Sequence, residues 1–497
     1  MGLRTLLTPQ VAAQPDATAL VGSGMTFTFA QLDDRIARAV SVLDARVAVG
    51  APVAVVGANH PDWVVAQHAV PRSGRLLAFL NHRLAAPELR EQIERAGAAL
   101  VLGEFAQLAR LRDAGTEIAM LDWAEWDALL ATSAPGAGAS VDDDAPAWLL
   151  FTSGTTGRPK GALLTARSLR AAVAASTAAR PVDPDDVYVF PFPLCHVAAY
   201  NVLHRHAHGR PVVLIDRFEP EAFAEAVATN GATSTSLAAT MLASLLDWID
   251  ERPEERVAPL VSLRTIAYGA APMPAALLQR ASDRLGVEFA QGYGMTELSG
   301  NAVFLDADAH RRGLAREPEL LRAAGRPAPG VEVRIAADGE ICVRAPQMML
   351  GYLDDPEATA ATIVDGWLHT GDAGRIDEDG YLRVVDRIKD IVITGGENVS
   401  SLEVEDVLMA HGSVAAVAVI GIPDPTWGEN VCAVVVARDG FDADALVAHA
   451  RERLAGFKAP RHVVVVDSLP VNAAGKVRKA ELRQLLAERP DLLGPRR

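Results

Sequence analysis

Short valine-rich apolar runs alternate with helical patterns along the first half of the chain, and this alternation constrains the fold more than any other feature. Residues 51–57 predict a strand, and the helical pattern of residues 63–70 follows after a turn. The same order recurs in residues 211–215 and 220–230. Repeated strand and helix units predict an α/β fold built on doubly wound parallel sheets.

The pattern changes near residue 330. Residues 331–335 and 340–344, joined by a turn at Asp338-Gly339, predict a β-hairpin, and a second hairpin is predicted around a turn at residues 377–380. The last hundred residues return to strands and helices, which is enough for a small α+β domain.

Composition excludes several classes of protein. A length of 497 residues suggests two to four folding units, and half of the residues are hydrophobic. The net charge of −16 disfavours nucleic acid and anionic lipid as main partners. Cys195, Cys342 and Cys432 lie far apart, so neither a disulfide framework nor a structural zinc site is expected.

The N-terminus does not resemble a signal peptide, and no apolar run reaches the roughly 18 residues of a membrane helix. We therefore expect a cytoplasmic protein with no integral membrane segment. The oligomeric state stays open, a homodimer included.

The strongest chemical signal is residues 152–161, which follow an apolar strand at 148–151 and hold three glycines, four hydroxyls and two cations. Glycines let backbone N–H groups face an anion, and hydroxyls and cations add to its binding. The order of residues differs from the Walker pattern, because Pro159 precedes Lys160 and Gly161 follows it. The candidate triphosphate-binding residues are Thr152, Ser153, Gly154, Thr155, Thr156, Gly157 and Lys160.

Two further glycine-containing segments follow predicted strands. Residues 287–290 lead into Gln291, Gly292, Tyr293, Gly294, Met295, Thr296 and Glu297, and residues 265–267 lead towards Gly269, Ala270 and Ala271. Glycine permits close approach of the backbone to a flat ligand, and the Glu297 carboxylate is able to hold Mg²⁺. Ligands of open α/β sheets bind beyond the carboxyl ends of strands, so all three glycine-containing strand exits are expected to converge on one nucleotide site.

These segments, together with Thr370-Gly371-Asp372, residues 386–390, residues 395–399 and Gly475-Lys476, resemble the ordered signatures of the adenylate-forming superfamily. This superfamily includes acyl-CoA ligases, peptide-synthetase adenylation domains and beetle luciferases. The resemblance spans nearly the whole chain.

The resemblance implies a large N-terminal domain at residues 1–388, with a small β-barrel-like portion, and a small mobile C-terminal domain at residues 389–497. It implies that Asp372 and Arg387 contact the ribose, and that Lys389 is the hinge. Lys476 is implied to reach the acyl carboxylate and the α-phosphate.

Other roles are also implied by the resemblance. Thr296 and Glu297 belong to the catalytic segment, and His196 matches a histidine near the acyl carboxylate, although a core or surface histidine is equally expected there. Gly395 and Gly396 are candidates for lining the pantetheine tunnel of coenzyme A. His204 and His208 would share a helical face, but no carboxylate joins them to form a metal site.

The resemblance implies an AMP-forming acyl-CoA ligase that uses ATP, Mg²⁺ and coenzyme A. The expected pocket segments at 197–200, 236–241 and 298–303 are mostly small or apolar, which favours a fatty, alicyclic or aromatic carboxylic acid. Arg205 and its neighbouring histidines leave a malonate-type dicarboxylate open. Two hypotheses also stay open: transfer of the acyl group to a carrier protein, and a non-catalytic protein that binds acyl nucleotides.

Three positions depart from the family pattern. Ser401 and Ala239 stand where proline is common, and Asn472 stands where threonine is frequent.

Overall fold

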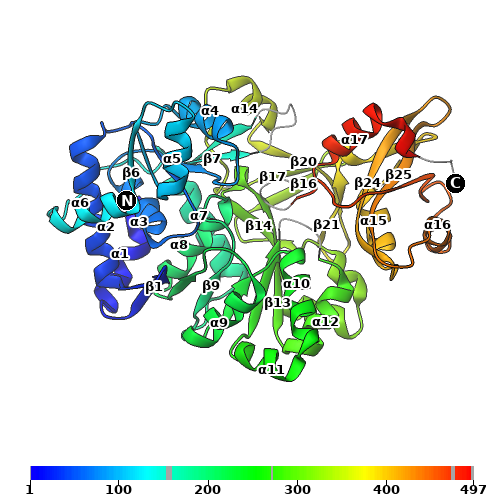
Figure 1. Cartoon of the computed structure of the whole chain (residues 1–497), viewed down its shortest axis with the longest axis horizontal. Coiled ribbons are helices and arrows are strands. Elements are labelled where there is room, and N and C mark those ends of the chain that lie inside the picture. The colour runs from blue at the N-terminus through cyan, green and yellow to red at the C-terminus, as the bar shows by residue number, and fades with distance from the viewer. Residues whose placement is uncertain (1, 153–158, 270–272, 472–475, 494–497) are drawn as a thin grey trace. The chain divides into compact units, whose positions relative to one another are not determined.

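The computed structural model describes residues 2–152, 159–269, 273–471 and 476–493 (Figure 1). The chain divides into two compact units, one of residues 1–333 with 343–368 and the other of residues 334–342 with 369–497. The first unit therefore holds most of the chain. The second holds the C-terminal part and one strand segment that precedes it.

A nine-stranded sheet dominates the first unit. Its order is β15 (Arg326–Pro327), β14 (Gly300–Leu305), β13 (Glu288–Met295), β12 (Thr265–Gly269), β11 (Ser234–Ser236), β9 (Tyr188–Phe190), β10 (Val212–Leu214), β1 (Thr18–Gly22) and β2 (Met25–Thr28). The strands from β13 to β1 run parallel, whereas β14, β15 and β2 add antiparallel edges.

A seven-stranded sheet completes the first unit. Its order is β18 (Gly351–Tyr352), β8 (Lys160–Thr165), β7 (Pro146–Thr152), β4 (Leu77–Leu80), β3 (Val53–Val56), β5 (Leu100–Gly103) and β6 (Ala119–Asp122). Every residue of β3, β4 and β5 is buried, as in parallel strands that are covered on both faces.

Helices follow the strands in both sheets. They are α1 (Arg4–Ala13), α2 (Phe29–Arg46), α3 (Pro61–Arg72), α4 (Ala86–Ala96), α5 (Phe105–Asp113), α6 (Trp123–Thr132), α7 (Ala166–Ala179), α8 (Tyr200–Ala207), α9 (Pro220–Asn230), α10 (Ala239–Glu251), α11 (Pro253–Val257), α12 (Ala275–Leu285), α13 (Ala307–Ala315) and α14 (Pro356–Thr362). Helix α9 shows how local residues predict the ends of a helix, because Pro220 begins it and Gly231 ends it in the left-handed conformation.

The second unit contains antiparallel strands and a small α+β core. A five-stranded sheet at its border consists of β16 (Glu332–Ile335), β17 (Glu340–Arg344), β20 (Trp367–Ile376), β19 (Ile363–Val364) and β21 (Leu382–Arg387). A second five-stranded sheet consists of β23 (Glu397–Val399), β22 (Val392–Thr394), β25 (Gly428–Ala437), β24 (Val414–Asp424) and β26 (His462–Val465). Helices α15 (Ser401–Met409), α16 (Ala443–Arg451) and α17 (Lys479–Glu488) pack with it.

The predicted fold class is confirmed, with a large N-terminal α/β part and a smaller C-terminal α+β part. The border between the compact units falls within strands of the border sheet, ahead of residue 389. Within the described ranges, no helix combines the length and the apolar character needed to cross a bilayer.

Candidate active site

The carboxyl ends of the parallel strands β13, β12, β11 and β9 lie along one edge of the nine-stranded sheet, because neighbouring strands run parallel and in register. His196 follows β9, and Gly269 ends β12. Glu297 follows β13 in the short 3-10 helix η3 (Thr296–Leu298). Two of the three predicted strand exits, at Gly269 and before Glu297, therefore lie along this edge, whereas the third follows β7 of the seven-stranded sheet.

The Gln291–Met295 segment differs from the prediction, because it is the second half of β13 and not a turn after the strand. It pairs antiparallel with β14. A Cβ atom at Gly292 would meet the side chain of Asn301, and one at Gly294 would meet the carbonyl of Gly300. The neighbouring strand β14 by itself therefore requires glycine at both positions, and close approach to a flat ligand stays a prediction.

Gly269 is constrained in the same way. A Cβ atom there would meet the carbonyl of Gly292 across the parallel pair β12 and β13. Ala270 and Ala271 lie outside the described residues. Tyr293, Met295 and Thr296 are half-buried, as is Gln291.

Glu297 is buried and makes a polar contact that the sequence patterns did not reveal. The phenol of Tyr352, on β18, donates a hydrogen bond to Oε1 of Glu297 over 2.8 Å. Burial and then the nearby Glu297 carboxylate raise the pKa of this phenol, so it remains a donor at neutral pH. An oriented, buried carboxylate is a hard oxygen ligand of the kind that Mg²⁺ prefers, so the residues present fit that ion.

Lys160 joins this group through the same tyrosine, because its ammonium lies 4.9 Å from the centre of the Tyr352 ring. The aromatic face attracts the cation without neutralising it. Tyr352 thus contacts both the lysine and the Glu297 carboxylate, an arrangement that suits the binding of phosphate groups with Mg²⁺.

The ends of the predicted triphosphate loop are paired strands. Thr152 is the last residue of β7 and lies opposite Lys160, the first residue of β8. The loop thus connects two antiparallel strands, and the next helix, α7, begins only at Ala166. The predicted residues Ser153, Gly154, Thr155, Thr156 and Gly157 lie outside the described residues.

A cavity of about 210 Å³ opens in the first unit. Pro191 and Pro193 follow β9, while Thr240, Met241 and Ser244 belong to α10, which follows β11. The remaining lining residues are His82, Arg83, Asp216, Arg217 and Phe218. Two residues of the expected acyl pocket, Thr240 and Met241, therefore do line a cavity, whereas Leu298 and Val303 are core residues with no exposed surface.

His196 is half-buried and precedes a short 3-10 helix (Val197–Ala199) that leads into α8. It comes six residues after the end of β9, in the stretch that starts with the cavity residues Pro191 and Pro193. Its predicted role beside the acyl carboxylate stays a prediction.

Arg205 on α8 does not line the cavity. It is buried, forms an ion pair of 2.7 Å with Asp186, and lies 4.5 Å from the centre of the Tyr188 ring. His204 and His208 do share a face, with ring centres 5.4 Å apart, and within the described ranges no third ligand completes a metal site with them. The charge of Arg205 is thus already matched, which removes the observation that favoured a dicarboxylate.

The second unit holds the predicted ribose contacts. Asp372 on β20 lies directly opposite Arg387 on β21, and Nε of Arg387 is 2.7 Å from Oδ1 of Asp372. Asp372 is buried, whereas the arginine side chain is 43% exposed. The Thr370 hydroxyl accepts a hydrogen bond from the Asp372 amide over 3.1 Å. The structure therefore brings together the two residues that the motif paired.

Lys389 is exposed, in a 3-10 turn (Ile388–Asp390), and its flanks are anchored within the second unit. Asp386 accepts hydrogen bonds from the amide and hydroxyl of Ser401, at 2.5 and 2.6 Å. Asp390 pairs with Arg483 of α17 over 2.8 Å. Lys476 is exposed and precedes Val477, which bridges to Val471.

The glycines proposed for coenzyme A form the turn between β22 and β23. Gly395 and Gly396 have φ of +61° and +85°, which suits the two central residues of a tight hairpin. A Cβ atom at Gly395 would lie 2.7 Å from the Trp427 ring. Glycine is thus required here by the turn and by Trp427, a partly exposed residue that the sequence patterns did not single out.

Comparisons with known proteins assign the chain to a family. Residues 7–353 match the family described as AMP-binding enzyme, and residues 403–476 match the AMP-binding enzyme C-terminal domain. The chain belongs to the AMP-binding enzyme family. The resemblance that its motifs carry is therefore confirmed at the level of the family.

The relatives of this AMP-binding enzyme are similar over almost their whole length. Feruloyl-CoA synthase of an Amycolatopsis species is 38% identical, over 95% of this chain and 96% of the relative. A Mycobacterium tuberculosis CoA ligase for a methyl-dioxo-octahydro-indenyl propanoate is also 38% identical, with the same coverage. The o-succinylbenzoate CoA synthetase of Bacillus subtilis, solved with its acyl-adenylate, is 31% identical with a TM-score of 0.86, over 96% of this chain and 98% of that one.

Proposed function

We propose that this AMP-binding enzyme activates a carboxylic acid with ATP to an acyl-adenylate, which releases pyrophosphate, and then transfers the acyl group to coenzyme A, which releases AMP. The observation that carries the proposal is the buried Glu297 held by Tyr352 at the carboxyl edge of the nine-stranded sheet. CoA ligases of aromatic and alicyclic acids among the relatives support it.

The first step brings anions together, because a carboxylate attacks the α-phosphate of ATP. Positive charge at Lys160 and Lys476, and hydrogen-bond donors of the loop between Thr152 and Lys160, would stabilise the charge that develops. Mg²⁺ held at Glu297 would offset the charge of the phosphate oxygens. Asp372 and Arg387 would bind the ribose and orient the nucleotide for in-line attack.

The cavity supports a compact substrate. Its volume of about 210 Å³ is below the roughly 300–1,000 Å³ typical of sites for drug-sized ligands. Its lining combines apolar proline, phenylalanine and methionine side chains with the charged side chains of Arg83, Asp216 and Arg217. A small aromatic or alicyclic acid therefore fits better than a long fatty chain.

The second step would require a change of arrangement, with Lys389 as the hinge and a domain boundary between residues 388 and 389. Lys389 is exposed in the turn Ile388–Asp390, which supports this position as the pivot, and rotation there would break the bond that Asp386 forms across it with Ser401. The Gly395-Gly396 turn with its exposed neighbour Trp427 would lie along the path of coenzyme A.

The test is a panel of aromatic, alicyclic, fatty and dicarboxylic acids, each incubated with ATP, Mg²⁺ and free coenzyme A and analysed by mass spectrometry. We expect a thioester with a compact aromatic or alicyclic acid. A parallel arm replaces coenzyme A with a phosphopantetheinyl carrier protein, and omission of any thiol with hydroxylamine present detects the adenylate alone. Adenylate without a thioester to coenzyme A would favour the carrier protein as acceptor, and no adenylate with any acid would refute the proposal.

A further inference from the structure

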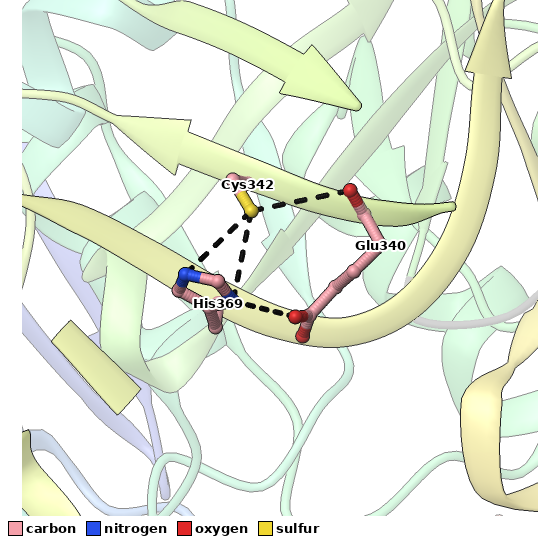
Figure 2. Close-up of side chains that lie close together, drawn as sticks. All are labelled: Glu340, Cys342 and His369. Atoms are coloured by element: carbon pink, nitrogen blue, oxygen red, sulfur yellow. Dashed lines mark hydrogen bonds and ion pairs between the residues drawn. The ribbon is translucent and has the colours of Figure 1, made fainter. Parts of the chain in front are cut away.

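Glu340, Cys342 and His369 form a cluster of three potential metal ligands in the second unit, and none of them has a role in the site proposed above (Figure 2). Glu340 and Cys342 are two residues apart on β17, so their side chains share one face of the strand. His369 lies on the neighbouring strand β20. Paired strands thus hold all three side chains on one surface.

The distances within the cluster are short. Sγ of Cys342 lies 3.7 Å from Nδ1 and 3.9 Å from Nε2 of His369, and Nδ1 lies 2.5 Å from Oε2 of Glu340. One ligand atom from each residue lies within 4.8 Å of the other two. In the parts of the chain that the structure describes, no other trio of histidine, cysteine and carboxylate side chains meets this condition.

A thiolate, an imidazole and a carboxylate are together a ligand set for Zn²⁺, whereas Mg²⁺ and Ca²⁺ prefer oxygen alone. Cys342 is fully buried, but the side chains of Glu340 and His369 are 12% and 26% exposed. The cluster is therefore shielded on the cysteine side and accessible on the histidine side, which leaves room for a water molecule as the fourth ligand.

We propose that Glu340, Cys342 and His369 form a binding site for a thiophilic divalent cation, with Zn²⁺ as the reference ion. Donor atoms of a tetrahedral zinc site lie about 3.3 Å apart, so Oε2 of Glu340 must withdraw from Nδ1 by less than about 1 Å. Rotation of the long glutamate side chain achieves this and leaves the pairing of β17 with β20 in place. The thiol loses its proton as the metal binds.

The site is coupled to the nucleotide residues through the other oxygen of the same carboxylate. Oε1 of Glu340 accepts a hydrogen bond of 2.8 Å from the amide of Gly371, which directly precedes Asp372. Movement of the Glu340 carboxylate onto a metal strains this bond and so displaces the backbone of β20 slightly next to Asp372. Bound Zn²⁺ therefore weakens nucleotide binding, and by reciprocity nucleotide weakens Zn²⁺ binding. This coupling, unlike the metal site itself, rests on the proposed ribose role of Asp372.

The experiment uses the full-length chain without an affinity tag. Co²⁺ is the spectroscopic probe, because a cysteine thiolate bound to it gives a charge-transfer band, and Zn²⁺ affinity is measured by competition with a chromophoric chelator. We expect one equivalent of metal and a thiolate band. Cys342→Ser abolishes the band and weakens Zn²⁺ binding by at least about tenfold. The matched controls are Cys195→Ser and Cys432→Ser, at the other two buried cysteines. Both control variants are expected to keep the thiolate band and the wild-type Zn²⁺ affinity.

A second variant tests whether weaker Zn²⁺ binding in Cys342→Ser could come from misfolding alone. His369→Gln keeps the thiol but loses the imidazole, so it is expected to weaken Zn²⁺ binding by at least about tenfold as well. Equal Zn²⁺ affinity in the wild type, Cys342→Ser and His369→Gln would overturn the site.

Coupling is measured separately with adenosine, which carries the ribose but no phosphate to chelate the metal. Metal binding without any effect on adenosine affinity would overturn the coupling and leave the site. Loss of adenylation in the acid panel would instead bear on the proposed function alone.

Discussion

The Tyr352 phenol donates its hydrogen bond to Glu297 from a strand that lies in the other sheet of the first unit. Strand β18 belongs to the seven-stranded sheet, whereas Glu297 follows β13 of the nine-stranded sheet. The position of the proposed magnesium ligand thus depends on the packing of two sheets. A change at Tyr352 should therefore act on Glu297 without touching the nucleotide.

Tyr352→Phe removes the donor and keeps the ring beside Lys160. Hydrogen bonds to charged groups contribute about 1.5–3 kcal/mol, so the Mg²⁺ concentration needed for half-maximal adenylation is expected to rise about tenfold or more. Pyrophosphate release measured over a Mg²⁺ series provides the check. Tyr352→Leu, which also removes the ring, should in addition raise the KM for ATP. An unchanged Mg²⁺ dependence of the phenylalanine variant would mean that the hydrogen bond does not orient the metal ligand.

Glu297→Gln keeps the shape of the side chain and removes its charge. The variant is expected to bind ATP but to adenylate poorly at ordinary Mg²⁺ concentrations, because an amide is a weaker ligand than a carboxylate. Equilibrium binding of ATP and hydroxylamine trapping of the adenylate separate the two effects. A variant with the wild-type Mg²⁺ dependence would remove Glu297 from the metal site.

Asp372→Ala is expected to weaken nucleotide affinity by about 1.5–3 kcal/mol, the range for hydrogen bonds to a charged group. The same hairpin offers a control in Asp377, which pairs with Arg383 over 2.8 Å near the turn. Asp377→Ala breaks an ion pair of similar length, so it should leave nucleotide affinity unchanged. Isothermal titration with AMP compares the two. Equal losses in both variants would indicate damage to the hairpin instead of a lost ribose contact.

Substitutions of Lys476 and Lys389 are predicted to impair different half-reactions. Lys476→Ala should nearly abolish adenylate formation and still convert supplied acyl-AMP to acyl-CoA. Lys389→Pro should do the reverse, since proline fixes φ and hinders the rotation that follows adenylation. Hydroxylamine trapping measures the first step, and thioester yield from synthetic acyl-AMP measures the second.

Lys458→Ala is the control for these two variants, because it removes a lysine that pairs with Glu403 in the second unit. It should keep both steps. Equal loss of both steps in the two folded test variants would contradict the domain rotation.

Stability of the first unit should fall in mild acid because of the buried His206. Burial lowers its pKa from 6.5 to about 4, with a hydrogen bond to the Ala19 carbonyl acting the other way. The neutral form is favoured in the folded state, so its contribution is complete above pH 6.5 and is lost as the pH falls towards 4. A shift of this size corresponds to about 3 kcal/mol.

Urea unfolding between pH 7.5 and 4.5 measures this dependence. His206→Leu should be less stable at pH 7.5 but should lose stability less steeply with acid. The same slope in both proteins would assign the acid sensitivity to other groups.

Local patterns were sufficient to predict the parallel α/β core and the two hairpins, because each strand and helix carries its own signal. The hairpin around Asp338-Gly339, for example, needs only turn residues and alternation. Asp372 and Arg387 were both assigned to the ribose through the motif, and they occupy opposite positions in the hairpin of β20 and β21.

Contacts between distant segments were not predictable in this way. Tyr352 lies 55 residues from Glu297 in the chain, and no spacing rule links them. The close contacts of Gly292, Gly294 and Gly395 with a neighbouring strand or ring were also not predictable, because composition shows only that glycine permits close approach and not what approaches. Ser401 shows the same limit, since only the structure reveals that its amide and hydroxyl both bind Asp386.

The pairing of Thr152 with Lys160 has a consequence for engineering of the enzyme. Strand pairing holds the two ends of the intervening segment about 5 Å apart. Lengthening a loop between such clamped ends costs little, since closure entropy grows only with the logarithm of loop length. The segment between them is therefore a place where libraries of altered length can be screened for new phosphate donors at little risk to folding.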